Sequence, residues 1–169
     1  MSIFRRSRVS NLSLSKEKAT DLDFEVFREP WNKYSLKDKS NVRGRVVLQK
    51  VLLKETLRPD GTVDSTKKGY QIDAQTITVV YNVPKELMGE PSNQGYSIEA
   101  LQAAIVQSDI GYDTIFQEWN EYIVEDGTKI RMQLLVTRVD RTSLHDKYGN
   151  PVYLIQTALN TTITPRAPK

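Results

Sequence analysis

The chain has no cysteine and only one histidine among its 169 residues. The absence of cysteine excludes a disulfide framework, a thiolate nucleophile, iron–sulfur ligation and a zinc knuckle. Acid–base and nucleophilic catalysis use histidine most often, and the single one here, His145, lies in a turn-like stretch at residues 144–151. A solvated loop residue is the simpler interpretation of that position, so we assign it no catalytic role.

Motifs for common enzyme chemistry are also missing. The chain contains no Gly-x-Ser-x-Gly nucleophile elbow and no glycine pattern that cradles a phosphate. Carboxylates are abundant, but Glu125 and Asp126 belong to a hairpin turn. Asp60 and Asp64 flank Gly61 without the spacing of a calcium loop. We therefore predict that the protein is not an enzyme and has no catalytic residues, cofactor, metal or small-molecule substrate.

Long hydrophobic runs are absent as well. The longest unbroken aliphatic run, residues 103–106, is far shorter than the roughly 20 apolar residues that cross a bilayer. No apolar stretch of about 7–15 residues follows the N-terminus, as a cleaved secretory signal would require. These absences predict no membrane contact and no secretion signal, and a cytoplasmic or virion location.

What the chain does have is charge sorted into blocks. Residues 1–44 hold ten lysines and arginines against six acids, whereas residues 85–127 hold nine acids against one lysine. The total of +3 therefore hides a basic region and an acidic region. Opposite fields on one subunit attract each other within one copy or between neighbouring copies.

Residues 1–41 differ from the rest and predict a basic N-terminal arm. A polar stretch at residues 10–20 has too few apolar residues to build a packed face. Large aromatic residues follow, and Pro30 among them argues against a continuous helix. Such anchors bury a large apolar area once they find a groove, on the protein's own body or on a neighbour. The predicted partner-binding residues of the arm are Arg5, Arg6, Arg8, Phe24, Phe27, Trp31 and Tyr34.

Residues 42–164 predict a β-rich body, followed by a short proline-containing tail at residues 165–169. Several runs are rich in β-branched residues or alternate apolar and polar side chains, as strands do. Asp-Gly at residues 126–127 is the strongest hairpin signal, and a long charged loop is expected between the first two strands. The fold class expected is β-rich α+β, with an antiparallel sheet, sandwich or barrel body. Its main strands are expected at residues 42–57, 70–81, 129–141 and 152–163.

A small helical insert is expected at about residues 84–122. Pro84 suits a single helical turn, and Ser97 resembles the N-cap of a helix that runs to about residue 107. A second helix is expected from residue 113 to about residue 120 or 122, because large aromatic residues recur there at helical spacing. Both helices would turn acids outward. The resulting acidic docking surface is predicted to contain Glu99, Asp109, Asp113, Glu118 and Glu121.

Two segments of the body resemble each other weakly. Residues 42–51 and 130–139 share an apolar alternation, and each is followed by a loop and then by a strand led by a tyrosine. A duplicated β-hairpin that frames the helical insert would explain the resemblance. Because any two amphipathic strands look alike, coincidence is the simpler interpretation.

The leading hypothesis is a non-enzymatic structural subunit that self-associates, or docks on partner proteins, through its N-terminal arm. Contact between a basic arm and an acidic surface closes rings or propagates lattices, and an extended segment can add to an exposed sheet edge. Proteins of this design occur in virus particles as capsid, neck or tail components, which is an analogy of architecture. We therefore expect a homo-oligomer or a larger protein assembly.

Two alternative hypotheses belong to other classes. A nucleic-acid-binding β-barrel of the OB type would use the basic arm for non-specific phosphate contacts. Residues 45–160 carry twelve bases and fifteen acids, however, whereas a phosphate-binding face needs concentrated positive charge. A metal-dependent enzyme would hold a divalent cation at Asp109 and Asp113 of the acidic insert.

Overall fold

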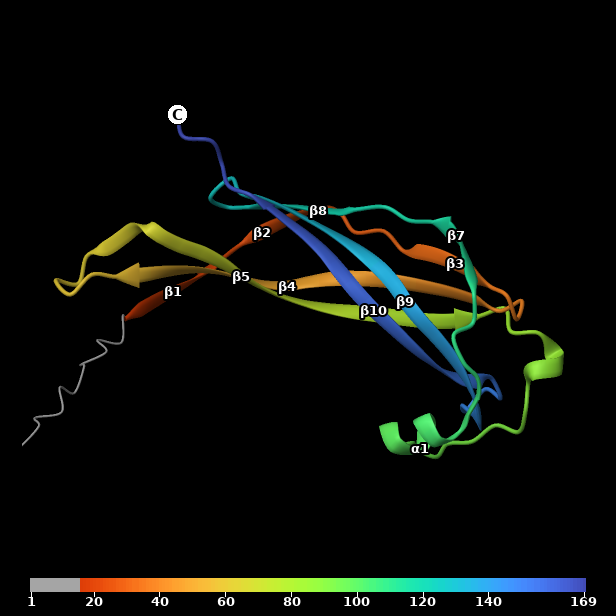
Figure 1. Cartoon of the computed structure of the whole chain (residues 1–169). Coiled ribbons are helices and arrows are strands. Elements are labelled where there is room, and N and C mark those ends of the chain that lie inside the picture. The colour runs from red at the N-terminus through yellow and green to blue at the C-terminus, as the bar shows by residue number, and fades with distance from the viewer. Residues whose placement is uncertain (1–15) are drawn as a thin grey trace, which may run out of the picture.

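The structure, a computed structural model, describes residues 16–169 as two antiparallel β-sheets (Figure 1). Each sheet has five strands, and the two sheets pack face to face without closing into a barrel. The expectation of a β-rich antiparallel body is confirmed, and the body is a sandwich. Arg5, Arg6 and Arg8 lie outside the described residues.

The first sheet is built around a long hairpin of β4 and β5, one end of which projects to the left in Figure 1. The opposite edge of β4 pairs with β3 near its start and with β1 near its end, and β7 pairs with β3. Residues 63–69, expected to lie in a long loop, belong to β5 because most of them pair with the end of β4. The strands of this sheet are β1 (Glu17–Leu22), β3 (Asn32–Leu36), β4 (Asn41–Leu57), β5 (Val63–Tyr81) and β7 (Tyr112–Phe116).

The second sheet has the same plan. Its long hairpin is β9 and β10, and the opposite edge of β9 pairs with β8 near its start and with β6 near its end. β2 pairs with β8 and ends the sheet. Gly127, at φ 87, forms the expected Asp-Gly turn between β8 and β9. The strands are β2 (Phe24–Arg28), β6 (Ile105–Gln107), β8 (Asn120–Val124), β9 (Lys129–His145) and β10 (Pro151–Thr164).

Two short helical segments lie between β5 and β6. A 3-10 turn, η1 (Lys85–Leu87), follows Pro84 as expected. The helix α1 (Ile98–Ala103) begins after Ser97, whose Oγ accepts a hydrogen bond of 3.1 Å from the backbone N–H of Ala100. The helix ends before the expected residue 107 because the chain enters β6 there. Within residues 16–169, no helix is long and apolar enough to span a membrane.

The second expected helix, at residues 113–122, is wrong. The chain there forms β7, a short irregular connection and β8. The buried residues of β8, Asn120, Tyr122 and Val124, alternate as in a strand rather than recurring at helical spacing. The helical insert at residues 84–122 is therefore reduced to η1 and α1, and the rest of it belongs to the two sheets.

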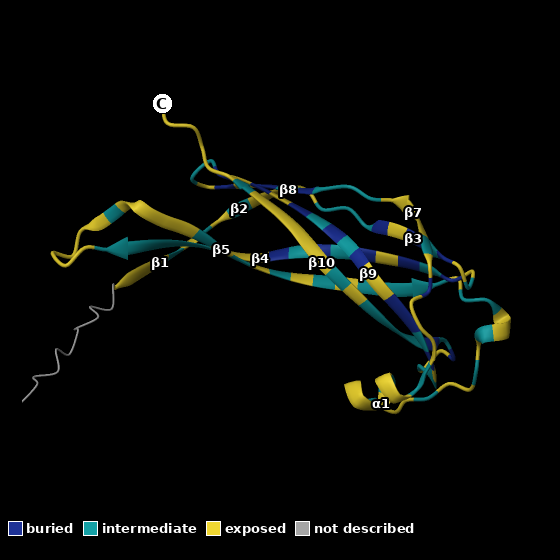
Figure 2. Ribbon diagram, viewed as in Figure 1, coloured by how far each residue is buried: buried dark blue, intermediate teal, exposed yellow. Residues whose placement is uncertain are grey.

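The core lies between the sheets and contains residues from both (Figure 2). Val46, Leu48 and Val51 of β4 pack in one cluster with Ile130 and other residues of β8 and β9. Each such side chain contributes about 1.5–3 kcal/mol when fully buried. The alternation that predicted these strands is therefore also the pattern that joins the sheets.

The body begins by Glu17, so the predicted boundary between arm and body at residue 42 is wrong. β1, β2 and β3 lie within the expected arm and pair with β4, β7 and β8. Tyr34 is 1% exposed, and the ring of Phe24 packs edge-on against Tyr122 at 5.9 Å. Phe24 pairs with Val124, far along the chain, so no local pattern could show that this strand belongs to the body. The arm prediction remains for residues 1–15, outside the described residues.

The weak resemblance between residues 42–51 and 130–139 marks two structural repeats, so coincidence was the wrong interpretation. Buried, half-buried and exposed residues follow each other in the same order in both segments. Both strands carry a bulge at the same position, Gln49 in β4 and Thr137 in β9. Identical residues recur at one constant separation along the chain: Asp21 and Asp109, Trp31 and Trp119, Asn32 and Asn120, Tyr34 and Tyr122, Asp38 and Asp126, Arg43 and Arg131, Val51 and Val139.

The two repeats exchange strands. β2 belongs to the first repeat but pairs with β8 of the second, and β7 of the second repeat pairs with β3 of the first. Phe24 lies opposite Val124, and the equivalent Tyr112 lies opposite the equivalent Leu36. Each repeat therefore supplies an outermost strand to the sheet of the other, so neither sheet is complete without both.

Candidate functional site

An open groove of about 320 Å³ lies where β1 passes into β2 and meets the end of β8. Its walls come from the start of β2, the end of β8, the turn after β8 and the C-terminal tail. We call this site the acidic groove. Its lining residues are Asp23, Phe24, Glu25, Ile123, Val124, Glu125, Gly127 and Arg166.

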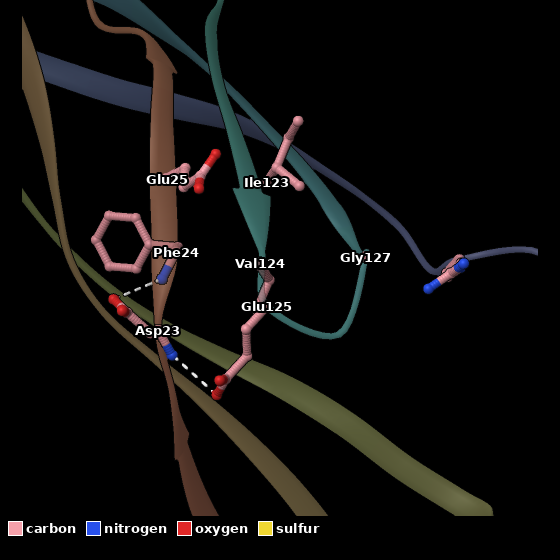
Figure 3. A pocket seen from close by; sticks show the side chains of 8 residues that line it. Asp23, Phe24, Glu25, Ile123, Val124, Glu125 and Gly127 are labelled. Atoms are coloured by element: carbon pink, nitrogen blue, oxygen red, sulfur yellow. Dashed lines mark hydrogen bonds between the residues drawn. The ribbon is translucent and has the colours of Figure 1, made fainter.

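Backbone hydrogen bonds fix the acidic groove in place. The N–H of Glu125 donates to the carbonyl oxygen of Asp23 at 2.9 Å, and the N–H of Asp23 donates to Oε1 of Glu125 at 3.1 Å. Oδ1 of Asp23 also accepts a bond of 2.8 Å from the N–H of Phe24, and Figure 3 shows both side-chain bonds. Asp23 and Glu125 therefore hold the two strands together and have restricted orientations.

The acidic groove carries more negative than positive charge. Asp23, Glu25 and Glu125 line it together with one base, Arg166. Among residues 16–169, none of these three carboxylates forms an ion pair. Ile123 is 40% exposed and lies beside Glu25, as Figure 3 shows, so the groove also offers apolar surface. It therefore suits a segment that alternates cationic and apolar side chains.

An open sheet edge adjoins the acidic groove. β2 pairs only with β8 in the described part of the chain, so its other edge has no strand partner. Val26 and Phe27 on this strand are 54% and 73% exposed. An exposed apolar edge strand is a template on which another extended segment can pair.

The structure separates the four predicted aromatic anchors. Phe24 and Tyr34 pack into the core clusters. Trp31 is half-buried on the outer face of the first sheet, with the guanidinium groups of Arg43 and Arg45 over its ring at 5.1 and 5.8 Å. Phe27 alone is largely exposed, so of the four it is the one that remains available to a partner.

The predicted acidic docking surface is not a single surface. Glu99 lies on α1, at the opposite side of the molecule from β8 in Figure 1. The backbone N–H of Asp109 donates to Asp140 at 2.7 Å, which ties its loop to β9. The other three predicted acids form ion pairs: Asp113 with Lys37, Glu118 with Arg28, and Glu121 with Arg131.

Sequence reasoning missed the acids of the groove. The alternation of Asp21, Asp23 and Glu25 is visible in the sequence, but none of these acids was predicted as a binding residue. Glu125 was interpreted as a hairpin-turn residue. The register that places Phe24 opposite Val124 joins segments distant in sequence, so no local pattern could have brought these acids together.

The structure also locates the acidic and histidine side chains considered as metal ligands or catalytic groups. No group of three or more His, Asp or Glu side chains there could hold a metal ion. His145, expected in a solvated loop, is the last residue of β9 and is half-buried. Its ring lies against Gly89, because a Cβ atom added to Gly89 would be 2.4 Å from the ring. Its position is thus explained by packing.

No protein family, curated protein or solved structure matches this chain. The chemistry and geometry of its own residues are therefore the basis for a functional proposal. The acidic groove and the adjoining open edge of β2 together offer charge, apolar surface and an unpaired backbone.

Proposed function

We propose that this chain is a non-enzymatic structural subunit whose basic N-terminal segment, residues 1–15, binds the acidic groove of a neighbouring copy. The observation that carries this proposal is the set of three carboxylates, Asp23, Glu25 and Glu125, that have no ion-pair partner among the described residues and lie beside an open strand edge. Charge of this kind attracts a cationic segment, and the open edge offers it backbone partners.

The N-terminal segment has the complementary composition. It carries three arginines and no acid, and apolar residues flank these arginines on both sides. Three cations match the three carboxylates of the acidic groove, while the apolar residues suit the exposed surfaces of Ile123 and Phe27. The residues that would make these contacts are Ile3, Phe4, Arg5, Arg6, Arg8 and Val9.

The direction of β1 favours a neighbouring copy over the protein's own groove. Leu22, at the end of β1, lies next to the groove, whereas Glu17, at its start, pairs with Thr56 near the tip of the projecting hairpin. Six strand residues span about 20 Å. The chain before Glu17 thus starts about 20 Å from its own groove and would have to reverse direction to reach it.

Head-to-tail contacts of this type repeat from one copy to the next. A heterologous contact closes a ring when its rotation closes, and otherwise it produces an open filament. Virus particles use such repeating subunits, so a capsid, neck or tail component is the setting we propose, by analogy of architecture.

The test is the mass of the full chain in solution, measured by light scattering at low salt over a range of concentrations. We expect an oligomer that dissociates when Arg5, Arg6 and Arg8 are changed together to glutamine. The groove variant Glu25→Gln/Glu125→Gln is expected to dissociate as well, because it removes two negative charges while each amide keeps one oxygen that can accept a hydrogen bond.

A matched control removes two exposed acids elsewhere, Glu86→Gln/Glu90→Gln, and is expected to leave the mass unchanged. Restored association on mixing an Arg5→Glu/Arg6→Glu/Arg8→Glu chain with a Glu25→Lys/Glu125→Lys chain would identify the two contacting surfaces. A chain that is monomeric at every concentration would contradict the proposal. So would an oligomer whose mass is the same in the unaltered chain, the arginine variant and the groove variant.

A further inference from the structure

The two repeats retain one identical pair of residues whose outer-face position the packed core does not explain. Three of the identical pairs are buried in the core: Asn32 and Asn120, Tyr34 and Tyr122, and Val51 and Val139. Another shared feature is an arginine that lies over a tryptophan ring on the outer face of each sheet. The distances to the ring centroid are 5.1 Å for Arg43 over Trp31 and 4.8 Å for Arg131 over Trp119.

In the first sheet this pair borders an open hollow of about 510 Å³. The hollow is lined by Trp31, Lys33, Arg43, Ile115 and Phe116, and we call it the aromatic hollow. Ile115 and Phe116, from the edge strand β7, are 57% and 38% exposed. The site therefore combines accessible apolar and aromatic surface with two cations.

The two cations of the aromatic hollow are not neutralised by neighbouring acids. Neither Lys33 nor Arg43 has a carboxylate within ion-pair distance in the described residues. Arg45 nearby is different, because it pairs with Glu29 at 2.9 Å, and the side chain of Glu29 is 9% exposed. The positive charge available to a ligand thus comes from Lys33 and Arg43.

The second repeat supplies an internal comparison. The position equivalent to Lys33 is Glu121, and its carboxylate forms an ion pair of 3.4 Å with Arg131. The second outer face therefore has the same arginine–tryptophan geometry but a neutralised cation. The repeats have diverged in charge where they are otherwise alike, and only the first face suits an anionic ligand.

We infer that the aromatic hollow binds single-stranded nucleic acid, with a base against Phe116 and its flanking phosphates on Lys33 and Arg43. Aromatic side chains stack on any base, and cations beside them neutralise the backbone, so such binding needs no sequence-specific contact. An acidic peptide would use the two cations but would gain little from the exposed ring of Phe116. This inference concerns the body of the protein and does not depend on the N-terminal segment or on assembly.

The test measures the fluorescence anisotropy of a labelled oligodeoxythymidine with the full chain. Lys33→Gln and Arg43→Gln are each expected to weaken binding by about three- to tenfold at low salt, and to reduce the slope of log affinity against log salt by about 0.7. Phe116→Leu removes stacking and keeps the bulk, and we expect about a tenfold loss. Thermal melting checks that each variant is folded. If another variant is unstable, Lys33→Gln still tests the inference, because Lys33 is exposed.

The matched control is Arg131→Gln on the second sheet, which has the same arginine–tryptophan contact and should bind the oligonucleotide like the unaltered chain. When Arg5, Arg6 and Arg8 are already changed to glutamine, Lys33→Gln and Phe116→Leu should still weaken oligonucleotide binding. Equal losses for Arg131→Gln and Arg43→Gln, abolition of binding by the N-terminal variant alone, or equal competition by polyglutamate would each overturn the inference. Failure here would leave the assembly proposal standing, because light scattering tests that separately.

Discussion

The hydroxyl of Tyr153 donates a hydrogen bond of 2.7 Å to Asp38, and so joins β10 of the second sheet to the turn that precedes β4 of the first. The repeat reproduces this contact between Tyr70 and Asp126, at 2.6 Å. Burial favours the neutral acid, but the hydrogen bonds from Tyr153, Ser40 and Arg141 outweigh it and hold the pKa of Asp38 below its usual value. Two equivalent tyrosine–aspartate contacts thus connect the sheets.

Replacing Tyr153 by phenylalanine should lower the free energy of unfolding by about 1–3 kcal/mol, because Asp38 loses a donor that water cannot easily replace. The Asp38 side chain is only 4% exposed. Urea denaturation measures the change. Tyr148→Phe is the control, since Tyr148 is 67% exposed, and it should leave stability unchanged. Equal effects at the two positions would contradict the role assigned to the Tyr153–Asp38 contact.

Stability should fall as the solution is acidified below about pH 4. The pKa of Asp126 is also lowered, because hydrogen bonds from Tyr70 and Thr128 outweigh its burial. The folded protein therefore keeps these carboxylates ionised at pH values where the unfolded chain binds protons, and that difference is lost as the pH falls through the folded-state pKa. Urea midpoints between pH 6 and pH 2 measure the slope. Asp38→Asn should flatten it, and an unchanged slope would show that Asp38 does not contribute.

Gly44→Ala should destabilise the sandwich by about 1–3 kcal/mol, because a Cβ atom at Gly44 would lie 2.5 Å from Cδ2 of Leu134 in the facing sheet. Gly69→Ala in β5 is the matched control, because a Cβ atom there meets nothing within 4 Å. Thermal melting compares the two. The cost of Gly44→Ala should shrink in a Leu134→Val background, and an unchanged cost would show that the clash is not its origin.

Removing residues 1–15 should leave the sandwich folded, whereas removing residues 1–30 should unfold it. The longer deletion removes β1 and β2, which pair with β4 and β8 and contribute Phe24 to the core. Circular dichroism and thermal melting measure the outcome. A cooperative transition of normal midpoint after the longer deletion would contradict the placement of these strands in the body.

Cutting the chain between the repeats should leave the two halves associated. Residues 93–95 are exposed and lie in neither sheet, so a protease site can be introduced there. Because β2 and β7 pair with strands of the opposite repeat, each isolated half would lack part of its sheet and should not fold alone. Size-exclusion chromatography after cleavage, without and with denaturant, checks this. Two halves that separate and stay folded would show that the exchange is not needed for stability.

Local signals were sufficient for several elements. The alternation of residues 42–57 predicted β4, Asp-Gly predicted the turn at Gly127, and Ser97 was identified as a helix cap. Each signal depends on residues within a few positions of one another, because side-chain alternation, turn conformation and capping are local properties. The β-rich antiparallel class could be inferred from these elements together.

By itself, the sequence determined the main strand-forming segments of the two long hairpins, the Asp-Gly turn and the segregation of charge. Tertiary structure decided that residues 17–36 belong to the body, that residues 112–116 and 120–124 are strands, and that Asp23 and Glu125 share a groove. The physical reason is that a strand takes its hydrogen bonds from another segment. Those partners, such as β2 and β8, lie far apart in the chain and are chosen by the packing of the whole sandwich.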